Sequence, residues 1–324
     1  MASSVLLSGD IYNPRIEILS RRSVVPYNPP MRSAHLTLAF AVLAATLLPS
    51  ANSHADGTRF PGTRALGMGG ALRAAATGDS ALQLNPSGIS LARAYFVEAA
   101  YQHSSPAASH DVHASVVDST SGFNVGGGFY YSYLSASPTG LPSANGHQLG
   151  IPLSFPFLDK VFLGATGKYL RLGFGDDTKK KGFTIDVGLT LRPIPFLSLA
   201  AIGYNLNDLG TAWAPRAFGG GIAILPMPIL LIGYDMVWET VYGDPTREKA
   251  LYYMGGAEFT LDQVAAFRAG GGKDGLTKNG YFSVGFSGIQ SQVGALDIGF
   301  RRDISGHSQA TILSVSARIF VPAL

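Results

Sequence analysis

A short stretch of the chain holds the residues best suited to acid–base or metal chemistry. It contains His103, His110 and His113, with Asp111 between the last two. Imidazole and carboxylate groups can hold a metal ion or serve a hydrolase. No second set of partners recurs nearby, so we interpret these residues as solvated positions at loop and strand ends. We therefore predict that the protein is not an enzyme and has no metal site and no cofactor.

Two further patterns suggest ligand chemistry that the rest of the sequence does not support. Gly67-Met68-Gly69 begins like a dinucleotide-binding loop, but Leu72 stands where the third glycine belongs. The charged run at 176–181 could contact lipopolysaccharide phosphates, although a solvated loop tip is the usual case. The net charge is only +3 and no basic stripe is present, which argues against nucleic acid as a partner. The absence of cysteine excludes disulfides and thiol chemistry.

The N-terminal region predicts export from the cytoplasm. Residues 36–48 form an apolar run, Pro49 ends it, and Ser53-His54-Ala55 is a small-x-small cleavage site. A transmembrane helix needs about 20 apolar residues, more than this run offers. We predict a signal peptide over 31–55 that is cleaved near Ala55. Residues 1–30 are then a non-native or disordered extension upstream of the true start, and the alternative is an unusually long n-region.

The remainder of the chain has the composition and periodicity of a membrane β-structure. Only 14% of the 324 residues are charged, against roughly 25% in soluble domains, and 40 are glycine. Most of the alternating segments have the ~9–11 residues with which a tilted strand crosses a bilayer, and short proline turns take turns with longer polar loops. A soluble sandwich is the rival interpretation. We predict an all-β fold, a transmembrane antiparallel β-barrel of about 14 strands over 92–324, with strands near 92–102, 110–118, 122–134, 145–154, 159–172, 181–192, 196–206, 216–225, 229–238, 249–259, 264–273, 279–289, 293–303 and 308–321.

Strict alternation also predicts which side chains face the lumen. In 181–192, Ile185 and Val187 alternate with Thr184 and Asp186, so the first pair should face lipid and the second the interior. Aromatic residues near the long loops, among them Tyr130 and Tyr204, predict a girdle at the headgroup level. The inward charges have both signs, and we expect them to form a salt-bridged lumen wall. These are Asp186, Arg192, Asp235, Arg268, Asp297, Arg301 and Arg318.

The segment 62–91 lacks strand alternation and is rich in small residues. It carries Gly62, Arg64, Leu66-Gly67-Met68-Gly69-Gly70-Ala71, Asp79-Ser80-Ala81 and Asn85-Pro86-Ser87-Gly88. This pattern resembles the opening of the FadL/TodX outer-membrane transport family, including its PorV-like branch, with Ser87 where alanine is usual and Gly78 where an acidic residue often sits. The resemblance implies a fourteen-stranded barrel whose segment 56–91 folds inside the lumen as a plug. The plug residues are then Gly67, Gly69, Gly70, Asp79, Asn85 and Pro86.

The resemblance implies a passive transporter of hydrophobic small molecules in the outer membrane of a Gram-negative bacterium. The alternative is a PorV-like barrel that acts as a scaffold or shuttle in protein secretion or surface assembly, with a general porin or an outer-membrane enzyme as weaker alternatives. We expect outer-membrane lipid, lipopolysaccharide and the barrel-assembly machinery as partners, and hydrophobic ligand or lipid in the lumen. In the family, ligand is thought to leave sideways where the third strand kinks. Gly126, Gly127 and Gly128 are the corresponding gate here, although similar triplets occur at 219–221 and 270–272.

Overall fold

The chain is described by a computed structural model over residues 61–105, 108–120, 125–137, 143–175, 179–211, 213–240, 249–261, 264–290, 293–305 and 309–321. The predicted extension at 1–30, the signal peptide at 31–55 and the cleavage site near Ala55 lie outside the described residues, as do 56–60 of the predicted plug.

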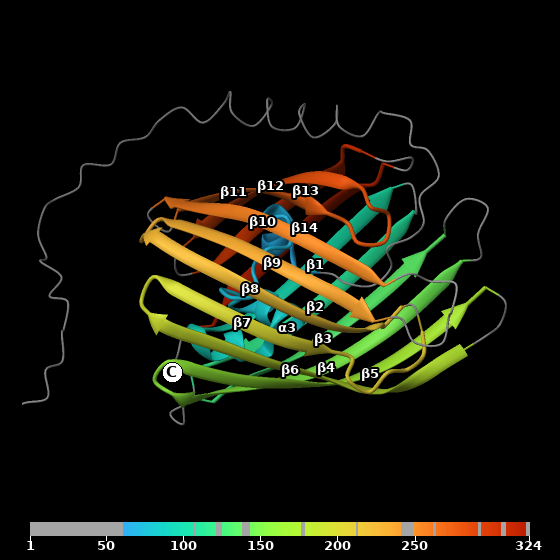
Figure 1. The fold of residues 1–324 in the computed structure, drawn as a ribbon, viewed down its shortest axis with the longest axis horizontal. Coiled ribbons are helices and arrows are strands. Elements are labelled where there is room, and N and C mark those ends of the chain that lie inside the picture. Colours follow the sequence, from blue (N-terminus) through green and yellow to red (C-terminus); the bar gives the residue numbers. More distant parts are fainter. Residues whose placement is uncertain are drawn as a thin grey trace, which may run out of the picture. The chain divides into compact units, whose positions relative to one another are not determined.

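Fourteen antiparallel strands follow one another around a closed barrel, as predicted from the alternation (Figure 1). Every predicted strand corresponds to one observed strand, with ends that differ by a few residues. The strands are β1 (Tyr95–Ser105), β2 (Ser109–Asp118), β3 (Gly126–Ala136), β4 (Ala144–Leu158), β5 (Val161–Phe174), β6 (Lys179–Ile194), β7 (Leu197–Tyr204), β8 (Arg216–Met227), β9 (Leu230–Thr240), β10 (Ala250–Leu261), β11 (Ala265–Lys273), β12 (Gly280–Gln290), β13 (Gly294–Asp303) and β14 (Thr311–Phe320).

The first and last strands close the wall. β1 pairs with β14 from Phe96↔Phe320 to Ser105↔Thr311, so neither strand is left as an open edge. At one mouth, called here the short-turn end, β4 and β5 are joined by residues 159–160 alone. At the opposite mouth, the long-loop end, residues 205–215 join β7 to β8.

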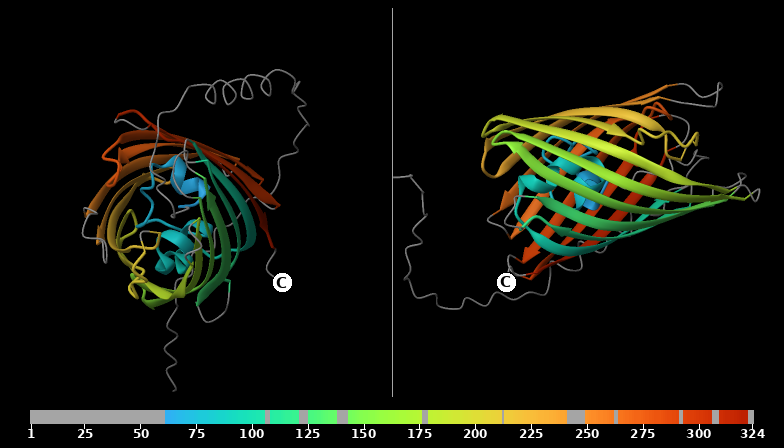
Figure 2. Two further views of the ribbon diagram at one scale, coloured as in Figure 1. Left: turned by 90° about the vertical axis from the view of Figure 1, so that its right-hand side faces the viewer. Right: turned by 90° about the horizontal axis from the view of Figure 1, so that it is seen from below.

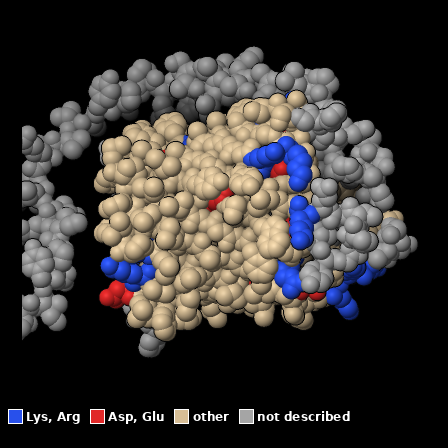
Figure 3. All heavy atoms as spheres, in the orientation of Figure 1, with Lys and Arg blue, Asp and Glu red and all other residues tan. Residues whose placement is uncertain are grey.

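The outer wall is apolar and the inner wall is polar. On β6, Ile185 is 48% exposed and Val187 46%, whereas Thr184 and Asp186 are buried. Figure 3 shows an outer face with few charged residues over its middle and most of its Lys and Arg toward the margins. An apolar surface of this extent suits the hydrocarbon layer rather than water. The predicted girdle is wrong for Tyr130 and Tyr204, because both lie on the lumen phase of their strands and are buried.

The segment before β1 folds inside the barrel, where the end-on view shows it enclosed by the ring of strands (Figure 2). It contains the short helices α2 (Thr63–Gly67) and α3 (Asp79–Leu84) and the 3-10 helix η1 (Pro86–Leu91). Met68, Leu72 and Leu82 are almost fully buried and belong to a core that forms where this plug meets the wall. Glycines at positive φ, Gly62 and Gly78, directly precede α2 and α3, so each helix begins where the chain turns at a glycine.

Among the described residues, no helix combines the length and the apolar character that a membrane crossing requires.

Candidate functional site

The plug backbone lies directly against a row of glycines on five consecutive strands. We call these lumen-facing residues the glycine track: Gly233, Gly256, Gly270, Gly285 and Gly299 on β9 to β13. A Cβ at Gly299 would meet the Thr63 carbonyl oxygen at 2.8 Å, and one at Gly270 would meet the Gly69 nitrogen at 2.6 Å. Such distances leave no room for any side chain. This row was not predicted from the sequence, because glycine is common throughout the barrel.

The glycines predicted for the plug take part in the same contact. Gly67 packs against Gly285, whose Cα lies 2.9 Å from the position of a Cβ on Gly67. Gly69 and Gly70 both have positive φ, 68° and 87°, which β-carbon-bearing residues rarely adopt. The sulfur of Met254 lies 2.9 Å from the position of a Cβ on Gly70. These three positions therefore require glycine for close approach, for backbone conformation, or for both.

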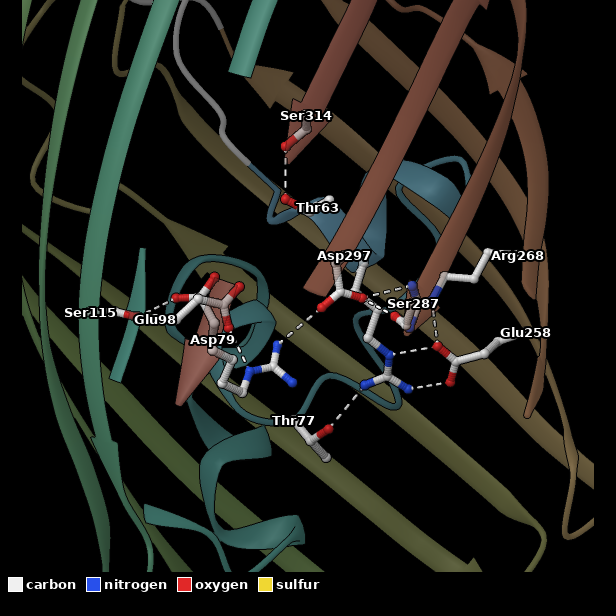
Figure 4. A network of polar contacts seen from close by, with 12 residues as sticks. Thr63, Thr77, Asp79, Glu98, Ser115, Glu258, Arg268, Ser287, Asp297 and Ser314 are labelled. Carbon is white, nitrogen blue, oxygen red and sulfur yellow. Dashed lines mark hydrogen bonds and ion pairs between the residues drawn. The ribbon is translucent and has the colours of Figure 1, made fainter. Parts of the chain in front are cut away.

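Six buried or partly buried charges connect the plug to the wall (Figure 4). From the plug, Arg64 binds Glu258 with both carboxylate oxygens engaged, Nε to Oε2 at 2.8 Å and Nη2 to Oε1 at 2.6 Å. The pairs then continue along the wall from Glu258 to Arg268 (2.6 Å), Arg268 to Asp297 (2.9 Å), Asp297 to Arg318 (4.0 Å) and Arg318 to Glu98 (2.6 Å). This ion-pair chain holds three cations and three anions. Burial of charge is tolerable here because each one has an opposite partner.

A second contact holds the middle of the plug. Asp235 of β9 accepts hydrogen bonds from the backbone nitrogens of Leu72 (2.9 Å) and Arg73 (2.8 Å) and pairs with the Arg73 guanidinium at 3.0 Å. Arg73 Nε donates to the Tyr204 hydroxyl at 2.8 Å, and that hydroxyl donates to the Leu84 carbonyl at 2.6 Å. The inward position of Tyr204 is explained by these two plug partners.

A third contact corrects the interpretation of His113 as a solvated residue. Its Nε2 lies 2.9 Å from Asp79 Oδ1 of α3, which also accepts from Ser115 Oγ at 2.6 Å, and its Nδ1 lies 2.8 Å from Ser132 Oγ. The imidazole is buried because it stands on the lumen phase of β2 and offers a partner to a plug carboxylate. The signal was present in the sequence, since His113 shares the phase of Ser115 rather than that of the apolar Val112 and Val116.

The other histidines lie apart from this contact. The His103 and His110 rings are 4.9 Å apart near the long-loop end, where His110 Nδ1 also lies 2.6 Å from the Tyr101 hydroxyl. Within the described ranges, no group of three or more His, Asp or Glu side chains is arranged to hold a metal ion.

Asn85 and Pro86 anchor the plug toward the short-turn end. Asn85 Nδ2 donates to the Arg73 carbonyl and to Thr190 Oγ1 of β6, both at 2.9 Å. Its side chain also accepts from the Ser87 nitrogen and so caps η1, in which Pro86 occupies the first turn. Two wall glycines, Gly164 and Gly188, have no space for a Cβ beside this segment.

The predicted lumen charges divide into two groups. Asp235, Arg268, Asp297 and Arg318 belong to the contacts just described, so they meet the plug directly or through a neighbour. Asp186, Arg192 and Arg301 bind wall partners instead. Asp186 pairs with Lys168 at 2.7 Å, Arg192 Nε donates to Ser198 Oγ at 3.2 Å, and Arg301 pairs with Asp274 at 3.2 Å and Asp303 at 3.4 Å. Arg64, Arg73, Glu98 and Glu258 complete the contacts and were not singled out as charged partners in the sequence.

The three glycines predicted as a lateral gate begin β3, beside the plug. A Cβ at Gly126 would meet Ile89 Cγ2 at 2.7 Å, and one at Gly128 would meet Leu82 Cδ2 at 3.0 Å. Pairing with β4 includes Gly127↔Leu153 and resumes at Tyr130↔Gly150, but two residue pairs between them are missing. Pro152 stands opposite Gly128 by the same register, and proline has no N–H to donate. The ladder is therefore weakest at this point.

Comparison with known proteins identifies the fold. No family model matches the chain, and no curated protein matches it. Among solved structures, the monoaromatic hydrocarbon channel CymD matches with a TM-score of 0.63 at 13% identity, over 82% of this chain and 98% of that one.

Two further structures agree. A Pseudomonas aeruginosa FadL homologue matches with a TM-score of 0.62 at 12% identity, over 84% of this chain and 98% of that one. The Pseudomonas putida toluene transporter TodX matches with a TM-score of 0.60 at 11% identity, over 80% of this chain and 96% of that one. The predicted resemblance is confirmed at the level of fold: over most of its length the chain matches the channels of the FadL/TodX family, as a closed fourteen-stranded barrel with its N-terminal segment in the lumen.

Proposed function

We propose that the protein is a passive outer-membrane channel for small hydrophobic molecules. The fold is shared with a monoaromatic hydrocarbon channel and a toluene transporter, and the outer wall is apolar as a membrane barrel requires. The plug is held in the lumen by the four polar contacts described above, at Glu258, Asp235, His113 and Thr190, and by the glycine track. A solute that enters from the long-loop end therefore meets the plug before it can reach the short-turn end.

The weak point between β3 and β4 supports a sideways route out of the barrel. It lies beside Leu82 and Ile89 of the plug, so an apolar molecule that reaches these residues is next to the wall. On the other side of the wall, Phe129 and Ile151 are exposed, 46% and 59%, toward lipid. Passage between the two strands would deliver the molecule into the hydrocarbon layer without transfer through water, which apolar surface disfavours. We infer that the gate at Gly126, Gly127 and Gly128 works with Pro152.

The route to the membrane is part of the same proposal. The sequence of residues 31–55 supports cleavage near Ala55, export, and insertion by the barrel-assembly machinery into a membrane of lipid and lipopolysaccharide. N-terminal sequencing of the protein from outer membranes should find Asp56 at the start. A mature chain that begins upstream of Met31 would contradict the processing scheme and the removal of residues 1–30.

The gate is best tested at Pro152 rather than at the glycines. Side chains at Gly126 or Gly128 would collide with the plug, so their replacement would disturb two features at once. Pro152→Val supplies the missing N–H and a β-branched side chain, and should close the ladder. Pro156→Val in the same strand, near the short-turn end, is the matched control. Toluene uptake into proteoliposomes should fall severalfold in the first variant and stay unchanged in the second. Unchanged uptake by a folded Pro152→Val protein would exclude this gate.

A further inference from the structure

A cleft lies between the plug and the long-loop end, and its lining residues indicate the chemistry of the molecule that enters. Two adjoining pockets share Gln83, Gln148, Leu170 and Trp213 among their lining residues. Gln83 belongs to the plug helix α3, and Trp213 to the connection between β7 and β8 at the long-loop end. The cleft therefore lies where a molecule from outside first meets the plug.

Part of the cleft is lined by leucines. On β5 the inward residues are Thr166 and Lys168 in the middle of the strand, then Leu170 and Leu172 toward the long-loop end, both buried. Leu134 of β3 lines the same pocket, and Trp213 completes it. Leucines on an inner wall would be unfavourable beside water alone, so their grouping favours an apolar occupant.

The same β3–β5 wall offers hydrogen-bonding groups beside the leucines, because Gln148 stands opposite Ser132 on one neighbouring strand and Leu170 on the other. Ser132 lines the cleft, with its oxygen held 2.8 Å from His113 Nδ1 and 3.4 Å from Gln83 Nε2. Gln148 contributes an amide whose nitrogen donates to the Tyr130 hydroxyl at 2.7 Å. A hydroxyl can both donate and accept, so a ligand hydroxyl is suited to a serine and two amides. A hydrocarbon would displace water from these groups and offer no hydrogen bond in its place, which costs free energy.

The charges around the cleft disfavour an anion. Among its described lining residues, the leucine-lined pocket includes Asp111 and no Lys or Arg. The two cations that line the adjoining pocket are already paired with carboxylates, Arg73 with Asp235 at 3.0 Å and Lys168 with Asp186 at 2.7 Å. A carboxylate ligand would lose its hydration and meet Asp111, with no uncommitted cation in return.

We propose that this cleft selects small neutral molecules that combine one apolar ring or short chain with one hydroxyl group, in preference to carboxylates and to plain hydrocarbons. This inference rests on the proposed channel function and names its substrate class. The apolar part lies against Leu134, Leu170 and Leu172, and the hydroxyl lies toward Ser132 and Gln83. The leucine-lined pocket is open at its mouth, and the empty space at its centre is about 30 Å³, room for about two water molecules. A single ring therefore sits partly in the open mouth, and larger bodies gain little further burial.

Binding can be followed with the protein's own fluorescence. The chain has two tryptophans, and Trp238 lies exposed on the outer wall. Trp238→Phe therefore leaves Trp213 in the cleft as the single reporter. The probes are phenol, toluene and benzoate, each titrated into the purified full-length protein in detergent. Phenol should change the Trp213 emission saturably. Its affinity should be at least about tenfold higher than that of benzoate, because the benzoate carboxylate meets Asp111 without a compensating cation.

Variants separate the apolar part of the cleft from its hydrogen-bonding part. Leu170→Asn should lower the affinity for phenol about tenfold. Leu170→Met keeps an apolar side chain of similar volume and should change that affinity less than about twofold. Ser132→Ala should remove the preference for phenol over toluene and leave toluene unchanged. Benzoate binding as tightly as phenol, toluene binding as tightly as phenol, or the absence of saturable binding by any probe would each overturn the inference.

A parallel uptake assay in proteoliposomes keeps this inference distinct from the channel function. If toluene and benzoate are taken up at the same rate as phenol and no selective binding is seen at Trp213, the inference about the cleft is wrong and the channel function stands. Selective phenol binding at Trp213 without uptake of any probe would establish the cleft and contradict the channel.

Discussion

The plug meets two sides of the barrel wall through different chemistry. Along β9 to β13 its backbone lies against the glycine track, and the ion-pair chain ties Arg64 to the same side. Along β3 to β5, η1 packs its backbone on Gly164 toward the short-turn end, and beyond that contact the plug meets single apolar side chains, a cleft lined by leucines and a ladder weakened at Pro152. Backbone packed on backbone leaves no space that a small shift could open, whereas apolar side chains can change rotamer. The difference assigns anchoring to one side and passage to the other.

The largest effect should come from a side chain placed in the glycine track. Gly270→Val would bring a Cβ to 2.4 Å from the Met68 carbonyl carbon and 2.6 Å from the Gly69 nitrogen. Neither the plug nor the wall can move away without losing other contacts, so we expect the folded barrel to be lost. The measurement is gel electrophoresis with and without heating, in which a folded barrel changes its migration on heating and the variant should not. Gly167→Val is the matched control, since a Cβ there has no atom within 4 Å.

A smaller loss should follow from breaking the ion-pair chain. Glu258→Ala leaves Arg64 and Arg268 facing each other without their shared carboxylate, and removal of one partner from a buried pair costs about 3–5 kcal/mol. Urea unfolding of the purified protein gives the change in free energy. Arg64→Met combined with Glu258→Met should recover part of it, because both charges are then absent from the plug contact. Equal stability of Glu258→Ala and the native protein would show that this contact does not anchor the plug.

The smallest of these effects concerns Tyr204, which joins Arg73 to the end of α3. Tyr204→Phe removes the hydrogen bonds to Arg73 Nε and to the Leu84 carbonyl, for a loss of about 1–3 kcal/mol because both partners are buried. Tyr234→Phe on the outer face of β9 should change the unfolding free energy by less than about 0.5 kcal/mol. If both substitutions have the same effect, Tyr204 is not a plug contact in the folded protein.

The barrel could be predicted from the sequence because its signal is local. Strand alternation in 181–192 identifies the lumen phase of Thr184 and Asp186 without knowledge of any partner, and turn chemistry places the strand ends. The same phase, applied to Tyr130, Tyr204 and His113, would have placed them inside. Their positions near the long loops predicted exposed sites, and for these three residues that prediction was wrong because all three are buried.

The plug contacts could not be predicted in the same way. Alternation gives the face of a residue but not its partner, so Glu258 and Glu98 could not be paired with Arg64 and Arg318 across about 200 positions of chain. The glycine track had a weak signal in the sequence, because each strand from β9 to β13 has at least one lumen-phase glycine. That signal becomes meaningful only when a plug backbone is known to lie against it.

The most direct test of the difference between the two sides is a reversible cross-link between β3 and β4. Phe129→Cys and Ile151→Cys stand opposite each other by register, on the outer face where the ladder is interrupted, and the native chain has no cysteine to interfere. The control pair, Phe259→Cys with Phe267→Cys, joins β10 to β11 on the anchoring side. Toluene uptake into proteoliposomes should stop when the first pair is oxidised and return on reduction, while the control pair transports in both states. Full uptake through the oxidised first pair would contradict passage between β3 and β4.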